Sequence, residues 1–158
     1  MPTFTLRTAG LPDAEAISAV LIASITQLCS ADHGNDPKVI ADWTANKTPG
    51  QIGQWLLNEQ IALLVAETSE GTIAGVGAAD LSGRIILNYV SPAHCRQGVS
   101  RAILAGLEEV LAQQGVRTAN LTATRTALEF YRAAAWQQCG PEQDDFGFPG
   151  YPMQKLLG

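Results

Sequence analysis

The stretch Ile86-Leu-Asn-Tyr-Val-Ser-Pro-Ala-His-Cys-Arg-Gln-Gly-Val-Ser-Arg-Ala-Ile-Leu104 decides the fold of this chain. It begins within an apolar strand, Arg84–Val90, which Pro92 prevents from continuing because proline has no backbone N–H for a sheet ladder. After Gly98 the apolar residues recur with a period of about 3.6, which predicts a long amphipathic helix. The chain therefore passes from a strand through a short loop with a glycine into a helix.

A strand that leads through a glycine loop into a helix can bind an anion. The first N–H groups of a helix have no internal partners, and the helix dipole places roughly +0.5 charge at this end. Gly98 lets the backbone approach a phosphate closely, and Arg96 and Arg101 can add charge-assisted hydrogen bonds. The same residues also fit an ordinary helix cap with solvated arginines, so this pattern alone leaves both interpretations open.

The rest of the chain predicts an α/β fold with a mixed sheet. Ile61–Thr68, Thr72–Leu81 and Arg84–Val90 are separated by turn residues and should form an antiparallel meander. In chain order we expect a strand at 3–7, a helix from Pro12, two short helices that begin after Asp36 and Thr48, the three strands of the meander, a helix from Gly98 to Gly115, a strand at Arg117–Ala123, a helix at Ala127–Ala134 and a strand at Phe148–Leu157.

Length and composition exclude several classes of protein. The 158 residues allow one domain, 1–158, with a substantial core, and 46% hydrophobic residues are too many for a disordered chain. The longest apolar run, Ile61–Ala66, is far shorter than the ~20 residues of a membrane-spanning helix. The N-terminus lacks the charged start and apolar stretch of a secretory signal.

Cysteine content and charge favour a cytoplasmic protein without a metal site. The three cysteines, Cys29, Cys95 and Cys139, form no Cys-x-x-Cys pair, and only two histidines are present. We therefore expect free thiols in a reducing compartment and no zinc. The net charge of −5 disfavours binding to nucleic acid or to an anionic membrane, and it weakly favours a cationic or amine-bearing partner.

Two segments resemble motifs of the GNAT N-acetyltransferase superfamily. The segment around Gly98 resembles the family's coenzyme A signature, a strand ending Val-x-Pro followed by Arg/Gln-x-x-Gly-x-Gly/Ala, with Cys95 and Ser100 at the first and sixth signature positions. Ala127–Trp136 is similar to the family's Ala-x-x-Phe-Tyr-x-x-x-Gly-Phe. The resemblance implies a GNAT-like α/β fold, with a mixed, mostly antiparallel central sheet of about six to seven strands flanked by helices.

The resemblance also implies direct transfer of an acetyl group from acetyl-CoA to a primary amine through a ternary complex, without a metal. The Val90 N–H would face the thioester oxygen, where negative charge develops, and Tyr131 would protonate the departing thiolate unless it is only a packed core aromatic. The cofactor-binding residues that it implies are Tyr89, Val90, Arg96, Gln97, Gly98, Val99, Ser100, Arg101, Thr124 and Tyr131.

The acceptor site and the proton-accepting base are less well defined by the sequence. An ammonium of pKa near 10.4 must lose a proton before it attacks. Acidic and imidazole candidates for this step are Asp32, His33, Asp36, Glu67 and Asp80, and a chain of waters is an equal alternative. His33 lies where the family usually builds its acceptor pocket, although Asp32-His33 also fits a polar loop between helices. Asn88 cannot act as a base, but it can position an amine or a water.

Three functions are compatible with these residues. The first is acetylation of a small-molecule amine, and the second is acetylation of a protein N-terminus or a lysine side chain, which needs an open groove that the helices within 36–57 would close. The third is a non-catalytic sensor that binds acyl-CoA. Many relatives of this fold pair as dimers, so a homodimer is compatible with the sequence.

Overall fold

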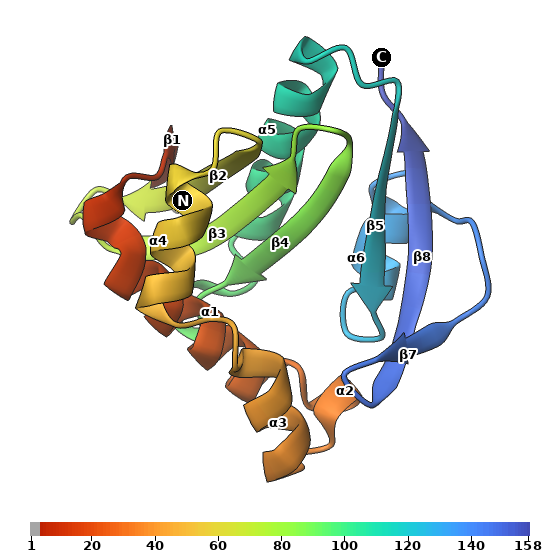
Figure 1. Cartoon of the computed structure of the whole chain (residues 1–158), viewed down its shortest axis with the longest axis horizontal. Coiled ribbons are helices and arrows are strands. Elements are labelled where there is room, and N and C mark those ends of the chain that lie inside the picture. Colours follow the sequence, from red (N-terminus) through yellow and green to blue (C-terminus); the bar gives the residue numbers. More distant parts are fainter. Residues whose placement is uncertain (1–3) are drawn as a thin grey trace.

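The computed structural model describes residues 4–158, which form one mixed sheet with helices on both faces (Figure 1). The strands are β1 (Phe4–Thr8), β2 (Ile61–Thr68), β3 (Ile73–Asp80), β4 (Arg84–Val90), β5 (Thr118–Thr124), β6 (Gln137–Gln138), β7 (Gln143–Asp145) and β8 (Phe148–Leu156). The helices are α1 (Ala14–Leu28), α2 (Ser30–His33), α3 (Pro37–Thr44), α4 (Pro49–Leu57), α5 (Val99–Gln113) and α6 (Leu128–Ala133), with short 3-10 turns at Leu11–Asp13 and Pro92–His94.

The sheet is divided at the contact between β4 and β5. The strand order is β1-β2-β3-β4-β5-β8-β6, with β7 also on β8, and every neighbouring pair is antiparallel except β4 and β5. β4 and β5 are parallel and share a single register pair, Arg84 with Asn120. Beyond this pair the two strands diverge toward their carboxyl ends, as Figure 1 shows.

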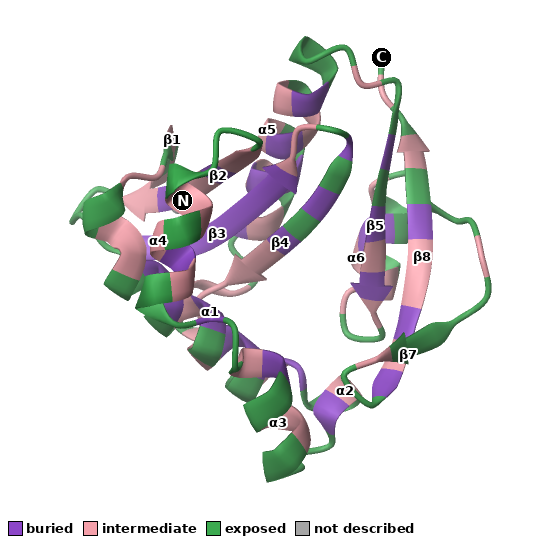
Figure 2. Ribbon diagram, viewed as in Figure 1, coloured by how far each residue is buried: buried purple, intermediate pink, exposed green. Residues whose placement is uncertain are grey.

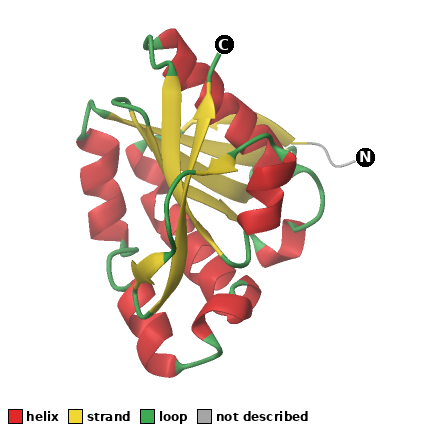
Figure 3. Ribbon diagram, turned by 90° about the vertical axis from the view of Figure 1, so that its right-hand side faces the viewer, coloured by secondary structure: helices red, strands yellow, loops and turns green. Residues whose placement is uncertain are grey.

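Two cores lie on opposite faces of the sheet. One packs Ile103 and Leu107 of α5 against the strands, and the other packs Ile17 and Leu21 of α1 against β2, β3 and β4. All four of these side chains are fully buried, and β3 between them is buried along nearly its whole length (Figure 2). A view from the side shows the helices on both sides of the strands (Figure 3). We refer to these two sides as the α5 face and the α1 face.

The stretch Leu11–Leu28, which includes α1, is long and apolar enough to cross a membrane by length and composition alone, with a mean hydropathy of 1.2 over 18 residues. Core helices and signal sequences meet the same criterion, so the feature is weak evidence of a membrane span. In this structure 33% of the stretch is buried, including Ile17, Leu21 and Ile25.

A bulge in β4 sets which side chains face each core. Ala78 pairs with Leu87 but Ala79 pairs with Ile85, so Ile86 is the extra residue of β4. Ile85 consequently belongs to the core of the α5 face and Leu87 to that of the α1 face, although an unbroken strand would keep both on one side. Tyr89 then follows Leu87 to the α1 face, and Val90 turns to the α5 face.

Close packing of α5 on β3 depends on glycine at position 77. A Cβ atom at Gly77 would lie 2.2 Å from Cγ2 of Ile103. We expect Gly77→Ala to lower the free energy of unfolding by about 1–3 kcal/mol because the helix must move off the sheet. Gly53→Ala is the matched control, because no heavy atom lies within 4 Å of that position in α4. The control should raise the stability by up to about 1 kcal/mol, and equal effects in urea denaturation would contradict this packing.

The expected elements are confirmed, with three additions. α2, β6 and β7 were not predicted, and with the last two the sheet has eight strands rather than six to seven. Gln137–Gln138 and Gln143–Asp145 are short and polar, so they carry no apolar alternation that would predict a strand. Thr3, the first residue of the strand expected at 3–7, lies outside the described residues.

Candidate active site

A cavity of about 650 Å³ occupies the gap between β4 and β5. Its walls come from both strands, from α1 on one face, and from α5 and α6 on the other, so the cavity passes through the sheet. It is lined by Ser24, Leu28, Cys29, Ile85, Ile86, Leu87, Asn88, Tyr89, Val90, Arg96, Gly98, Val99, Ser100, Arg101, Leu121, Thr122, Thr124, Thr126, Ala127, Phe130 and Tyr131. The divergence of two parallel strands therefore produces a passage open to both helix layers.

The amino end of α5 faces the cavity without a side-chain cap. Gly98 is the N-cap residue, with φ of 80°, and within residues 4–158 no side chain accepts a hydrogen bond from the first turn. Two other helices differ, because Asp36 caps α3 and Thr48 caps α4. No heavy atom of residues 4–158 lies within 4 Å of the Cβ position of Gly98, so the helix end is open. Its free N–H groups and Arg96 and Arg101 form a site for an anion.

The backbone of β4 offers a further donor to the gap. The Ser91 N–H donates to the Ala74 carbonyl at 2.8 Å, so this group points toward β3. Successive N–H groups of an extended strand point to opposite sides, and the Val90 N–H therefore points toward β5 across the gap. Among residues 4–158 no strand pairs with this edge of β4 at Val90, because the register pair that β4 shares with β5 is at Arg84.

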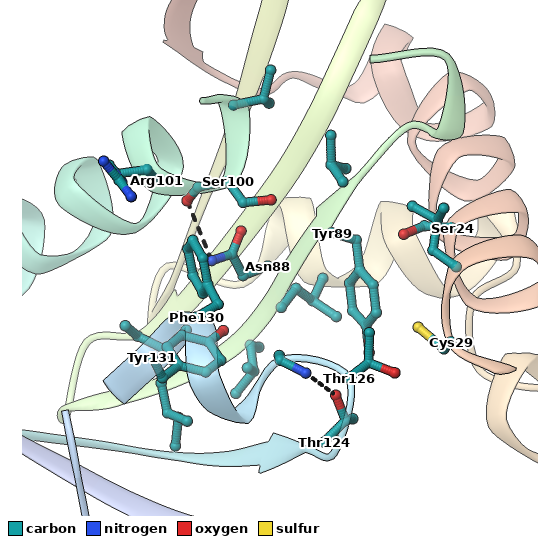
Figure 4. A pocket seen from close by; sticks show the side chains of 18 of the residues that line it. Ser24, Cys29, Asn88, Tyr89, Ser100, Arg101, Thr124, Thr126, Phe130 and Tyr131 are labelled. Carbon is teal, nitrogen blue, oxygen red and sulfur yellow. Dashed lines mark hydrogen bonds between the residues drawn. The ribbon is translucent and has the colours of Figure 1, made fainter. Parts of the chain in front are cut away.

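Tyr131 and Asn88 lie together on the α5 face of the cavity (Figure 4). Tyr131 is 7% exposed, and burial raises the pKa of its hydroxyl to about 12 although Asn88 acts against this rise, so the phenol is protonated at neutral pH. Asn88 donates through Nδ2 to the Ser100 carbonyl at 3.4 Å. Its Oδ1 is buried and has no hydrogen-bond partner among residues 4–158. An unpartnered amide oxygen costs about 1–3 kcal/mol, which a ligand N–H can recover.

On the α1 face the cavity is lined by Ser24 of α1, Cys29 directly after α1, Tyr89 of β4 and Thr126 of the loop after β5 (Figure 4). Burial raises the pKa of the Cys29 thiol to about 12 and raises the pKa of the Tyr89 hydroxyl as well, so both groups are neutral at pH 7. This part of the cavity holds hydroxyl and thiol groups that can donate or accept hydrogen bonds without carrying charge.

Two long-range contacts join the two halves of the chain on the α1 face. The Asp32 carboxylate accepts hydrogen bonds from the Arg125 N–H at 2.7 Å, from the Thr126 N–H at 3.2 Å and from the Thr126 hydroxyl. Trp43 of α3 packs against Phe148 of β8 with ring centroids 4.5 Å apart. α2 and α3 are thus attached to the C-terminal half of the sheet on this face.

Residues 44–157 match the family model described as the acetyltransferase (GNAT) domain. The chain belongs to the GNAT acetyltransferase family. It is therefore an acetyltransferase, and the fold expected from the two sequence motifs is confirmed. No curated protein matches the chain.

Solved structures share this fold over nearly the whole chain. A GCN5-related N-acetyltransferase from Rhodopseudomonas palustris is 23% identical with a TM-score of 0.87, and the match covers 99% of this chain and 98% of that one. PaiA N-acetyltransferase from Thermoplasma acidophilum, solved with coenzyme A, is 15% identical with a TM-score of 0.82, over 98% and 99%. A phosphinothricin acetyltransferase from Sinorhizobium meliloti, solved with AcCoA, is 19% identical with a TM-score of 0.71, over 99% and 89%.

The structure of this GNAT acetyltransferase brings most of the predicted site residues together. The residues predicted for the cofactor line the cavity with the exception of Gln97, which is exposed outside it. Tyr89 lines it with its side chain on the α1 face (Figure 4). Of the two predicted acceptor contacts, Asn88 lines the cavity, whereas His33 is buried outside the lining. Both ring nitrogens of His33 are occupied, by the Ile25 carbonyl at 2.8 Å and the Asn35 N–H at 2.9 Å.

The acidic candidates for the base are likewise held by other groups. Asp32 accepts the three hydrogen bonds from the loop after β5, and Asp36 caps α3. Glu67 is paired with Arg7, and Asp80 accepts from the Ser82 N–H at 2.9 Å in a turn. None of these four residues lines the cavity. Within residues 4–158 no group of three His, Cys, Asp or Glu side chains is arranged to hold a metal ion.

Several cavity residues were not predicted. Ser24 is on an amphipathic helix and Cys29 directly follows it, and in sequence both have the same pattern as core residues. Thr126 is part of a loop with no motif of its own, and its position depends on Asp32, which lies 94 residues earlier. Phe130 precedes Tyr131 within the second motif, so that motif was the one signal that could have indicated it.

Lys47, which follows α3, is a buried charge near the α1 face. It is 5% exposed, and its Nζ donates to Asn46 Oδ1 at 2.6 Å and lies 5.9 Å from the centre of the Phe146 ring. Burial lowers its pKa from 10.5 to about 8, against an opposing effect of Asp145. This difference corresponds to roughly 3 kcal/mol at about 1.36 kcal/mol for each pKa unit.

The Lys47 pKa predicts a pH dependence of stability. Between pH 8 and 10.5 the unfolded chain retains a proton on Lys47 that the folded chain has lost, so folding becomes more favourable as the pH rises. The difference in free energy of unfolding between the wild type and Lys47→Met should therefore rise by roughly 3 kcal/mol from pH 8 to 10.5, in favour of the wild type. The contributions of the other titrating groups cancel in this difference. Urea denaturation of both proteins at several pH values measures this quantity. A difference that stays constant with pH would contradict the assignment.

Proposed function

We propose that this protein transfers an acetyl group from acetyl-CoA directly to the primary amine of a small molecule, within a ternary complex. The observation that carries the proposal is a single cavity that joins an uncapped helix end on the α5 face to a part lined by Ser24, Cys29 and Tyr89 on the α1 face. The donor and the acceptor can therefore enter from opposite faces of the sheet and meet in the gap between β4 and β5.

The α5 face has the donor set that acetyl-CoA requires. The free N–H groups at the start of α5, with Arg96 and Arg101, would bind the pyrophosphate. The edge of β4 that faces the gap would pair with the amide groups of the pantetheine arm. Among residues 4–158 no strand occupies that edge between Arg84 and the carboxyl end of β4. Cys95 and Ser100, which depart from the signature, keep these groups accessible. Cys95 Sγ bonds to the Pro92 carbonyl at 3.3 Å within the loop, and Ser100 lines the cavity.

The reaction needs three groups in the gap. The Val90 N–H would stabilise the oxyanion that forms when the amine attacks the thioester carbon. The Asn88 Oδ1 would accept an N–H of the attacking amine and hold its lone pair toward that carbon. Tyr131, which keeps its proton at neutral pH, would donate it to the thiolate as the carbon–sulfur bond breaks. These steps give the acetylated amine and free CoA.

The contacts across the α1 face favour a small acceptor over a protein. Asp32 attaches α2 to the loop after β5, and Trp43 attaches α3 to β8, so both connections cross the face from which a peptide would have to enter. A peptide needs an extended open groove, whereas these contacts leave a bounded chamber lined by Ser24, Cys29 and Tyr89.

A panel of acceptors tests the proposal. The purified protein is mixed with acetyl-CoA and with small primary amines or, separately, with peptides that carry a free N-terminus or a lysine. Free CoA is detected with a thiol reagent, and the acetylated product by mass spectrometry. We expect thiol release with at least one class of small amine and background rates with the peptides. Turnover of peptides alone would indicate a protein acetyltransferase, and acetyl-CoA binding without turnover of any amine would indicate a sensor.

A further inference from the structure

Asp145 lies beside the cavity on the α1 face. It ends β7, and its side chain lies over Gly150, where a Cβ atom would come within 3.4 Å of Asp145 Oδ2 and within 2.8 Å of Thr122 Cγ2. Thr122 lines the cavity, and glycine at position 150 leaves the room that the carboxylate occupies. The strand β7 itself lies next to α2 in Figure 1. The hairpin of β7 and β8 therefore places a carboxylate on the same side of Gly150 as Thr122, one residue behind the cavity lining, to which Asp145 itself does not belong.

Asp145 is half-buried, and its carboxylate makes no hydrogen bond and no ion pair within 4.0 Å to any of residues 4–158. The acidic side chains considered above as bases are all engaged by other groups, Asp32 by three hydrogen bonds. Asp144, the preceding residue, is exposed and points to the other side of β7. A partly buried carboxylate without a partner is costly, and such groups mark sites that bind or react with a ligand.

The charges around Asp145 leave its own charge uncompensated. Arg84 and Lys47 are the cations that act on it, and Asp32 and Asp144 are the anions. Arg84 is held by Asn120 Oδ1 and Thr122 Oγ1, both at 2.9 Å, and is not bonded to Asp145. At pH 7 two positive and two negative neighbours balance, so the site carries the single negative charge of Asp145. Burial raises the pKa of Asp145, which suits a group that accepts a proton.

We propose that Asp145 binds the ammonium group of the acceptor and accepts its proton, an inference that rests on the proposed amine acetyltransferase function. The ammonium N–H bond breaks as a carboxyl O–H bond forms, and the neutral amine attacks the thioester carbon. The amine nitrogen loses its second proton as the amide forms, while Tyr131 protonates the departing sulfur and regains a proton from that nitrogen. Asp145 then releases its proton to solvent. The acceptor is thus a primary amine that is cationic at pH 7.

Asp145→Asn tests this role against the matched variant Asp144→Asn, which removes the same charge one residue away. At pH 7 we expect Asp145→Asn to lower kcat/KM for an alkylamine by about 100-fold or more, and Asp144→Asn to stay near the wild type. The deficit of Asp145→Asn should shrink as the pH approaches about 10, where the amine is increasingly neutral without help. With an O-alkylhydroxylamine, which is already neutral at pH 7, Asp145→Asn and the wild type should react at similar rates.

The melting temperature and the KM for acetyl-CoA complete the test, because a merely structural role would change them. The KM for acetyl-CoA should be unchanged in Asp145→Asn. The melting temperature should be unchanged or higher, because the substitution removes a charge that has no partner. If the wild type acetylates amines and Asp145→Asn has the same pH profile and rate, the role of Asp145 is overturned while the proposed function stands. An equal loss with the O-alkylhydroxylamine would also overturn it. If the wild type acetylates no amine, the proposed function itself fails.

Discussion

Tyr131→Phe should lower kcat by about 100- to 10,000-fold and leave the KM for acetyl-CoA nearly unchanged, because it removes a proton donor that acts only as the thiolate departs. Tyr131 is buried against Phe130 and Trp136, whose ring centroids lie 5.1 Å and 6.0 Å away, so phenylalanine keeps the packing. The measurement is the initial rate of thiol release with the best amine of the panel, at saturating acetyl-CoA.

Tyr151→Phe is the control for this substitution, since Tyr151 packs against the same core but does not line the cavity. Its rate should match the wild type. A rate for Tyr131→Phe within about ten-fold of the wild type would contradict the role of the hydroxyl as the general acid. Melting temperatures of the two variants show whether the fold is retained.

Gly98→Glu should weaken acetyl-CoA binding by about 100-fold or more, equivalent to roughly 3 kcal/mol. The new carboxylate would lie at the N-cap of α5, where it repels the pyrophosphate and competes for the free N–H groups. Isothermal calorimetry with acetyl-CoA measures the dissociation constant of each variant without the need for an acceptor.

Two further variants separate charge from strain at Gly98. Gly98 has a φ of 80°, a conformation that costs a non-glycine residue roughly 1–2 kcal/mol, and Gly98→Ala carries this strain without the charge. Gln113→Glu adds the same charge at the exposed far end of α5. We expect Gly98→Ala to weaken acetyl-CoA binding modestly and Gln113→Glu to leave it unchanged. Equal weakening in Gly98→Ala and Gly98→Glu would mean that backbone strain, and not repulsion of an anion, explains the result.

The sequence predicts the part of the site whose residues are close together along the chain. The end of β4, the loop with Gly98 and the first turn of α5 are contiguous, so their periodicity and their glycine indicate an anion site, and the resemblance adds acetyl-CoA. The second motif includes Tyr131, which in the structure is on α6 and lines the same cavity. The motif also has Gly where this chain has Ala135, and the φ of 72° at Ala135 explains that preference for glycine.

The other half of the site depends on contacts between distant residues, which single-sequence patterns do not contain. Asp32 meets Arg125 across 93 positions, and Trp43 meets Phe148 only because the fold brings α3 to β8. Asp145 belongs to a three-residue strand of polar residues that resembles a loop in sequence. His33, predicted near the acceptor, is instead held by the Ile25 carbonyl and the Asn35 N–H. Topology, and not local propensity, therefore determines the acceptor side.

The central claim is that the acetyl group passes directly from acetyl-CoA to the amine. Cys29 is the cavity nucleophile that would carry an acetyl group in a two-step route, but its raised pKa of about 12 leaves it protonated at pH 7. Initial rates with both substrates varied test the claim most directly. Direct transfer predicts double-reciprocal lines that intersect, since both substrates must be bound before CoA leaves. Parallel lines would show that CoA leaves before the amine binds, and would contradict this account.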